Sequence, residues 1–177
     1  MSAPVPAPPP AGPEPRPVDA DAFRRAAAYF ASGVTVVTTL SGGIEHAMTA
    51  SAFTSVSLDP VLVLVCVEKD ARFHDAVLDA GTWAVSMLIA DARPAADWFA
   101  SKGRPLIGQF DRFAHRRGPA TGAPLLEDAL AWLECRTTAI HDGGDHDIVV
   151  GSVVEAVVGN RDAPPLVHYR SHYGTMR

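Results

Sequence analysis

Five hydroxyl side chains gather in the segment MTASAFTSVSLDP, residues 48–60: Thr49, Ser51, Thr54, Ser55 and Ser57. Hydroxyls and free backbone N–H groups can hold a phosphate without adding much charge. The apolar run VLVLVCV at residues 61–67 follows directly and predicts a strand buried on both faces. A loop beside that strand would expose such donors. The segment therefore predicts either a phosphate cradle around Phe53 or a polar strand whose hydroxyls face solvent.

Two cationic side chains, Lys69 and Arg72, follow the apolar run. Cationic groups make strong, charge-assisted hydrogen bonds to phosphate oxygens. The pair is therefore a candidate for further phosphate contacts, and the alternative is ordinary surface charge at the start of a helix.

Two later motifs also place polar groups beside turns. In GGDHDIVVG, residues 143–151, the glycines predict a tight hairpin, with Asp145 and His146 where the turn meets the strand. His146 there would hydrogen-bond a ligand's amide or phosphate, or both residues serve the turn alone. In HYRSHY, residues 168–173, aromatic and basic groups alternate. They would flank a planar ligand, or they form a C-terminal edge strand with a solvated Arg170.

Several chemistries lack their motif in this chain. Neither G-x-G-x-x-G nor G-x-x-x-x-G-K-[ST] occurs, so both common nucleotide-binding turns are absent. Without H-E-x-x-H or paired C-x-x-C, no metal site is expected; His141 and His146 only flank a turn. The absence of G-x-S-x-G argues against a serine hydrolase.

Composition predicts one globular domain. The chain has 177 residues, 47% of them hydrophobic and 20% charged, which suffices for a sizeable core. A net charge of −5 argues against binding to nucleic acid or to an anionic membrane. No run of about 18 apolar residues occurs, so no membrane-spanning helix is expected. Cys66 and Cys135 are interpreted as buried free thiols, which favours a cytoplasmic location.

The elements that would position these residues are mostly strands. Residues 1–18, rich in Pro and Ala, predict a disordered extension before a folded domain at 19–177. Helices are expected from Asp19 or Asp21 to Gly33 and over Asp70–Asp79 and Asp91–Ser101. Strands are expected at Val34–Leu40, Ile44–Thr49, Val61–Val67, Trp83–Leu88, Ala129–His141, His146–Val158 and Leu166–Tyr169, with a surface connection over 102–128. Hairpin connections predict a mainly β fold, an antiparallel barrel with peripheral helices.

In this order, the motifs resemble the flavin reductase-like family, the NAD(P)H:flavin oxidoreductase components of two-component flavin-dependent monooxygenases. The likeness covers roughly residues 20–173. The matching stretches are Phe23–Thr39, Ala47–Pro60 with the apolar run behind it, Gly122–Arg136, His141–Val153 and Leu166–Tyr173. Each motif alone is weak, but five in sequence over one domain are specific.

The resemblance implies an FMN-binding split β-barrel that binds FMN or FAD as a homodimer, with the flavin near the subunit interface. It implies that NADH or NADPH reduces the flavin, which then diffuses to a separate flavin-dependent oxygenase. It also implies contacts for particular residues. The flavin cradle would contain Thr49, Ser51, Ala52, Phe53, Thr54, Ser55, Ser57 and Leu58. The residues near the flavin phosphate would be Lys69, Arg72, Phe73 and His74. The residues on the nicotinamide side would be His146, Tyr169, Arg170 and Tyr173.

The chain departs from the family pattern at three positions. The family often has Asn-Ser where this chain has Ser51-Ala52, so one flavin contact is expected from backbone alone. A Thr or Ser frequent near the phosphate is Phe73 here, and the usual Gly of the last motif is Ser171. These departures bear on the choice between FMN and FAD.

Hydride transfer between nicotinamide C4 and flavin N5 needs no protein nucleophile, which fits a chain without a catalytic triad. In this interpretation His146 orients the nicotinamide and Asp145 supports it. One alternative is a non-enzymatic flavin carrier or redox sensor on the same fold. Another is an enzyme that keeps its flavin and acts on an organic substrate directly.

Overall fold

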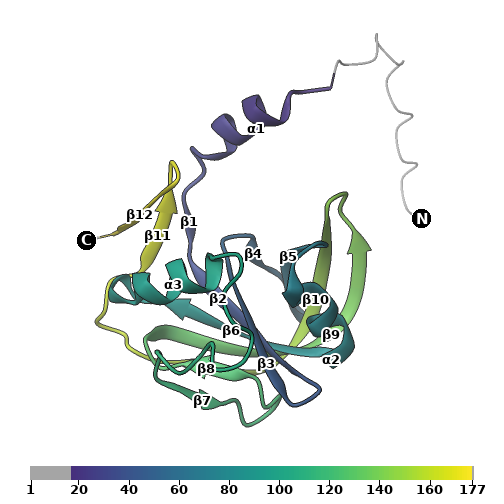
Figure 1. Cartoon of the computed structure of the whole chain (residues 1–177), viewed down its shortest axis with the longest axis vertical. Helices are drawn as coiled ribbons and strands as arrows, with labels where there is room; N and C mark the ends of the chain where they lie inside the picture. The colour runs from purple at the N-terminus through teal and green to yellow at the C-terminus, as the bar shows by residue number, and fades with distance from the viewer. Residues whose placement is uncertain (1–16, 177) are drawn as a thin grey trace, which may run out of the picture.

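Seven strands form one antiparallel sheet in the computed structural model, which describes residues 17–176 (Figure 1). The strand order is β3-β2-β6-β9-β10-β5-β4. The bounds are β2 Thr35–Ser41, β3 Ile44–Ala50, β4 Phe53–Leu58, β5 Val61–Glu68, β6 Thr82–Leu88, β9 Ala129–Asp142 and β10 His146–Val158. Most of the predicted extension, residues 1–16, lies outside the described residues.

The two edge strands of this sheet are neighbours in the chain. β3 ends at Ala50 and β4 begins at Phe53, so only Ser51 and Ala52 separate them. The three Cα–Cα steps between Ala50 and Phe53 span at most about 11 Å, so the sheet must curl until its edges meet at this bend. Within residues 17–176 no ladder joins β3 to β4, so the curled sheet remains split there. The predicted mainly β fold with peripheral helices is confirmed.

Three α-helices of the described residues lie outside the sheet. The first, α1 (Ala20–Ala27), is capped by Asp19, whose carboxylate accepts a hydrogen bond from Ala22 N at 3.2 Å. The prediction that it continues to Gly33 is wrong, because no α1 residue is buried and no core contact extends it. α3 (Arg93–Ala100) follows a 3-10 turn, η1 (Ala90–Ala92). No helix within the described part of the chain is long and apolar enough to cross a membrane.

The helix expected near residues 70–79 is confirmed as α2 (Arg72–Ala80). It ends at Gly81, whose φ of 61° is the left-handed conformation that glycine adopts without steric cost. Phe73, Ala76 and Val77 bury the inner face of α2. This packing fixes its first turn against the sheet, beside the end of β5.

A small second sheet contains two strands, β1 and β12, that were not expected from the sequence. β1 (Ser32–Gly33) pairs with β11 (Leu166–Tyr169), which pairs with β12 (His172–Thr175). The β11–β12 turn holds Arg170 and Ser171 at φ values of 51° and 63°. Two consecutive left-handed residues form the usual two-residue hairpin turn, although Gly or Asn normally occupies such positions. The family's usual glycine would relieve this strain at Ser171.

Strand β5 is buried on one face only, which corrects the prediction of burial on both faces. Val63, Val65 and Val67 are buried, whereas Leu62, Leu64 and Cys66 are half-exposed. In an antiparallel sheet alternate residues face opposite sides, and no helix covers the outer side of β5 in the described chain. Cys66 is therefore only half-buried, whereas Cys135 is fully buried as predicted.

Residues 102–128 are more than a surface connection. They contain a short hairpin, β7 (His115–Arg117) and β8 (Pro124–Leu126), and bury Gln109 and Phe110. The Gln109 amide donates to the carbonyl of Glu45 on β3 at 2.6 Å. The Phe110 ring packs on Phe99 of α3 at a centroid distance of 5.0 Å. These contacts fasten the segment to the sheet, so the prediction of a surface connection is wrong.

Gly151 on β10 provides a test of the central packing. A Cβ added there would lie 2.7 Å from Trp83 and 3.1 Å from Cys135, both fully buried. We expect Gly151→Ala to lower the free energy of unfolding by about 1–3 kcal/mol, the usual cost of overpacking. Gly174→Ala, where a Cβ would meet nothing within 4 Å, is the control. Equal denaturant midpoints for the two variants would contradict this packing.

Candidate functional site

A cleft of about 540 Å³ opens where the two edges of the sheet meet. Its walls are the end of β3 with the following bend, the first turn of α2, the loop after α3, and the start of β10. Six residues predicted from sequence line it: Thr49, Ser51, Ala52, Arg72, Phe73 and His146. The structure thus brings together residues that are nearly a hundred positions apart in the chain.

The bend presents backbone groups and one free hydroxyl. Ser51 and Ala52 are exposed, and the Ala52 carbonyl accepts a hydrogen bond from Cys66 N at 3.0 Å, which ties the bend to β5. The Thr49 hydroxyl instead donates to the carbonyl of Ala96 on α3 at 2.7 Å. Thr49 therefore fastens α3 to β3, whereas Ser51 remains available to a ligand.

A cationic group lines the opposite side of the cleft. The Arg72 guanidinium donates to the Arg104 carbonyl at 2.8 Å. Arg104 itself is half-buried and donates to Ala47 O and to Gln109 Oε1, the latter at 3.2 Å. Burial, and then the Arg72 charge, lower the pKa of Arg104. Arg104 therefore acts as a brace for the loop, while Arg72 and Lys102 are the exposed cations at the cleft.

The sequence analysis missed the loop Ser101–Arg104 and His46. Lys102 is 89% exposed, and its Nζ lies 3.6 Å from Glu68 Oε1 across the cleft. Burial, followed by the charge of Arg72, lowers the pKa of His46, which favours a neutral ring in the cleft wall. The signal available in the sequence was the SKGR stretch, a glycine between two cations. In the structure Gly103 has a φ of 78°.

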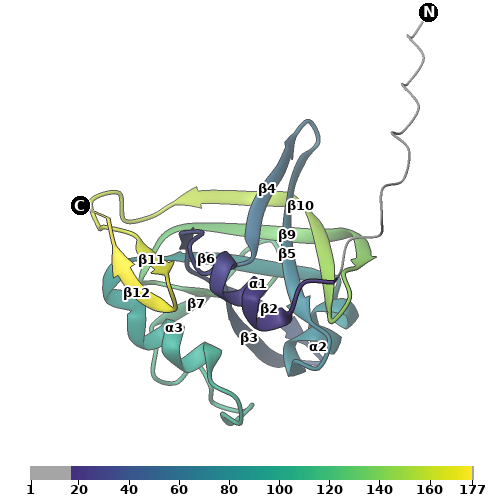
Figure 2. The same ribbon diagram turned by 90° about the horizontal axis from the view of Figure 1, so that it is seen from above.

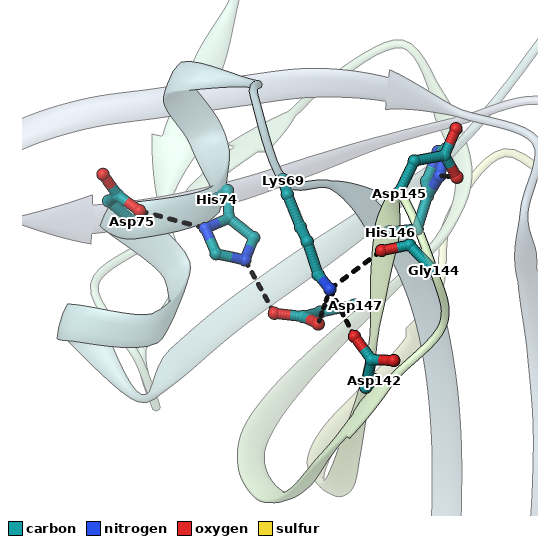
Figure 3. Close-up of polar contacts among 8 residues, drawn as sticks. All are labelled: Lys69, His74, Asp75, Asp142, Gly144, Asp145, His146 and Asp147. Carbon is teal, nitrogen blue, oxygen red and sulfur yellow. Dashed lines mark hydrogen bonds and ion pairs between the residues drawn. The ribbon is translucent and has the colours of Figure 1, made fainter.

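His146 and Asp145 form the predicted pair. The two are joined by a hydrogen bond of 2.7 Å between His146 Nδ1 and Asp145 Oδ1 (Figure 3). This hydrogen bond lowers the pKa of Asp145. Because an ionised carboxylate only accepts hydrogen bonds, Nδ1 is the donor in this pair, which leaves Nε2 as the ring nitrogen available to a ligand. The His146 ring lines the cleft, so Nε2 can accept a hydrogen bond from an N–H group of a ligand.

Lys69 and His74, predicted on the phosphate side, do not line the cleft. Lys69 Nζ donates to Asp142 and to the Gly144 carbonyl, the latter at 2.8 Å, and His74 Nε2 lies 2.8 Å from Asp147 Oδ2 (Figure 3). The hydrogen bond to Asp142 is the main cause that raises the pKa of Lys69. The hydrogen bond to Asp147 is the main cause that raises the pKa of His74. A phosphate contact from either residue stays a prediction.

A second pocket of about 740 Å³ lies beside the same bend. It shares Ser51, Ala52 and Cys66 with the cleft, and its other lining is mostly apolar. Phe53 and Thr54, two predicted cradle residues, line this pocket rather than the cleft. The bend therefore has a polar cleft on one side and an apolar pocket on the other.

The remaining predicted residues lie outside both pockets. Ser55, Ser57 and Leu58 sit on the β4–β5 hairpin, which projects beyond the body of the molecule (Figure 2). Tyr169 and Arg170 contact Tyr29 after α1, with the Arg170 guanidinium 5.1 Å from the Tyr29 ring centroid. The roles predicted for them are not tested by this chain alone.

Tyr173 also lies away from the cleft. Its ring packs edge-on against His168 at a centroid distance of 5.6 Å, with the Arg93 guanidinium 5.8 Å away. Burial is the main cause that raises the pKa of Tyr173. Its contact with a nicotinamide likewise stays a prediction.

Comparison with known proteins supports the resemblance. The family model "Flavin reductase like domain" matches residues 26–177. An NADH-dependent FAD reductase of Streptomyces globisporus is 45% identical over 141 residues, covering 79% of this chain and 77% of the relative. The reductase component of 4-hydroxyphenylacetate 3-monooxygenase from Thermus thermophilus is 40% identical, covering 86% of this chain and 94% of the relative.

A solved structure shares the architecture described above. BorF, the flavin reductase component of a bacterial two-component tryptophan halogenase, has 45% sequence identity and a TM-score of 0.84. The match covers 89% of this chain and 98% of BorF. Sequence and architecture agree over nearly the whole described chain, and the protein therefore belongs to the flavin reductase-like family.

Proposed function

We propose that this protein is an NADH-dependent flavin reductase that delivers reduced FMN or FAD to a separate flavin-dependent oxygenase. The observation that carries the proposal is one cleft whose walls hold exposed backbone and hydroxyl groups, the Arg72 cation, and the His146–Asp145 pair. The Streptomyces relative is named for NADH and FAD, and the Thermus relative for a monooxygenase. Both names support the same activity here.

The residues of the cleft fit a flavin nucleotide. Its volume of about 540 Å³ is in the usual range for cofactor sites, about 300–1,000 Å³. Exposed groups at the Ser51–Ala52 bend would hold the ring system, and Arg72 would bind the phosphate as a charge-assisted donor. When flavin and NADH are both bound they supply the hydride transfer themselves. The protein needs only to bind and orient them.

His146 would orient the nicotinamide. Asp145 holds the Nδ1 proton, so Nε2 can accept a hydrogen bond from the carboxamide N–H of NADH. Asp145 thus favours the tautomer with the proton on Nδ1. This arrangement assigns hydride-donor binding to the start of β10 and flavin-phosphate binding to the start of α2.

A homodimer is the assembly that we propose. Leu58 is 88% exposed at the tip of the projecting hairpin, and Val56 and Val61 beside it are also exposed. The outer face of β5 and the apolar pocket are open, and α1 buries none of its residues. Contiguous exposed apolar surface marks interaction sites.

The molar mass measured by light scattering should be twice the 18.7 kDa of one chain. A monomer at micromolar concentration would contradict the proposed homodimer.

A cytoplasmic location agrees with the state of the two cysteines, both of which are free. Reduced thiols are typical of that compartment. Burial raises the pKa of the Cys135 thiol to about 12, so this side chain stays protonated and unreactive. Retention of the native protein in the soluble cell fraction, with both thiols reactive to alkylation after unfolding, would support the location.

The decisive experiment is anaerobic stopped-flow mixing of the flavin-loaded protein with NADH or NADPH. We expect loss of the visible absorbance of oxidised flavin on the timescale of turnover, with FMN or FAD, and release of the reduced flavin through a filter. No bleaching would favour a carrier or sensor. Bleaching with flavin retained throughout turnover would favour an enzyme that acts on an organic substrate directly.

His146→Ala tests the nicotinamide assignment. One lost hydrogen bond is worth about 0.5–1.5 kcal/mol, so kcat/KM for NADH should fall by up to about tenfold. Flavin affinity, measured by fluorescence titration, should stay within about twofold of the original. His141→Ala, an exposed histidine across the same hairpin, is the matched control. Equal kinetics for the two variants would remove His146 from the site.

Arg72→Gln tests the phosphate assignment. Loss of a charge-assisted hydrogen bond should weaken FMN binding by roughly tenfold or more, while riboflavin, which has no phosphate, should bind almost as before. Arg161→Gln, an exposed arginine in the turn before β11, serves as the control. The measurement is the ratio of FMN to riboflavin dissociation constants at fixed salt. A ratio unchanged by Arg72→Gln would contradict the assignment.

A further inference from the structure

Asp147 and His74 join the start of β10 to helix α2. His74 Nε2 and Asp147 Oδ2 are 2.8 Å apart, and the two side chains are only 12% and 15% exposed. Successive side chains of a strand point to opposite faces. Asp147 therefore faces α2, while its neighbour His146 lines the cleft (Figure 3).

Lys69 contacts the turn between β9 and β10 from the segment that precedes α2. Its Nζ lies 3.6 Å from Asp147 Oδ1 and donates to Asp142 and to the Gly144 carbonyl. Its backbone N–H also donates to the Asp145 carbonyl at 3.0 Å. Residues on both sides of His146 are thus fastened to the segment that links β5 to α2.

This restraint acts on a turn that would otherwise have considerable freedom. Two glycines, Gly143 and Gly144, precede Asp145, and Gly144 has a φ of 84°. Glycine allows a wide range of backbone conformations, so the local sequence alone does not fix the direction of the His146 ring. The β5–β10 ladder, in which His146 pairs with Glu68, holds the backbone after the turn, and the side chains of Lys69, His74 and Asp147 add a restraint beyond the ladder.

The restraint also connects the two walls of the cleft. Arg72 and Phe73 line the cleft from the first turn of α2, directly before His74. A hydrogen bond from His74 to Asp147 therefore sets where the His146 wall stands relative to the Arg72 wall. Such alignment matters because hydride transfer is sensitive to small errors in position.

We propose that Asp147, held by His74 and Lys69, is a positioning residue that fixes His146 in the orientation needed to bind the nicotinamide. This inference rests on the proposed function, specifically on the role of His146. It assigns His74 and Lys69 to a support behind the His146 wall of the cleft rather than to direct contact with a flavin phosphate.

The charge state of His74 makes this restraint dependent on pH. The groups facing its ring are Asp147 on β10 and Asp75 on α2, with Lys69 and Asp142 beyond Asp147. Hydrogen bonds to Asp147 and then Asp75 raise the pKa of His74. The stabilisation that the His74–Asp147 pair gives to the folded protein is therefore complete below about pH 6.5, the ordinary pKa of histidine. It is lost as pH rises through the raised pKa of His74.

The test is a double-mutant cycle of His74→Leu with His146→Ala, read as kcat and KM for NADH. We expect His74→Leu to lower kcat/KM by about fivefold in the original protein, mainly through KM, and by less than about twofold when His146 is absent. His74→Gln, which retains an N–H donor, should recover most of the loss. Asp79→Asn, on an exposed part of α2, is the control and should change nothing.

A second measurement follows KM for NADH between pH 6 and 9. KM should rise with pH in the original protein and show a smaller rise in His74→Gln. If His74→Leu lowers kcat/KM for NADH by the same factor in the original protein and in His146→Ala, the positioning role is overturned. A loss from His146→Ala with none from His74→Leu would overturn it while leaving the proposed function intact. No effect of His146→Ala would overturn the positioning role together with the nicotinamide assignment of His146, whereas the reductase activity itself is tested by the stopped-flow experiment. Circular dichroism of each variant identifies misfolding.

Discussion

The two-residue connection between β3 and β4 is the constraint on which the rest of the structure depends. These strands are opposite edges of a seven-stranded sheet, yet only Ser51 and Ala52 lie between them. A connection of that length forces the sheet to curl, and the seam leaves backbone groups free of ladder hydrogen bonds. A polar cleft forms on one side of this bend and an apolar pocket on the other. The site is therefore a direct consequence of the topology.

In the proposed function the two walls of the cleft have separate tasks, and charged contacts outside the cleft join the walls. The α2 wall presents Arg72, and the β10 wall presents His146 with its Asp145 partner. Behind them, His74, Asp147 and Lys69 join α2 to the β9–β10 turn. Each individual pair is partly solvated and contributes little to stability on its own. Their value lies in orientation, which a flavin reductase needs more than it needs reactive side chains.

Features set by local sequence were predictable, whereas features set by distant packing were not. The Gly143–Gly144 hairpin, the Gly81 end of α2 and the His146–Asp145 pair each depend on residues a few positions apart, and all three are present. Arg104 contacts the carbonyl of Ala47, 57 positions away, so the SKGR stretch could mark a polar loop but not the part of the sheet against which the loop lies. Strand β12 was missed because its turn uses Arg170 and Ser171 where glycine is usual. Likewise, an apolar run such as β5 does not reveal whether one face or two are covered.

A crystal structure of the protein with FMN bound would show whether the cleft at the bend is the flavin site. We expect the isoalloxazine ring to lie against the Ser51–Ala52 bend and the phosphate to lie within hydrogen-bond distance of Arg72, with the His146 ring on the nicotinamide side. FMN bound elsewhere, or in the cleft with its phosphate remote from Arg72, would contradict it.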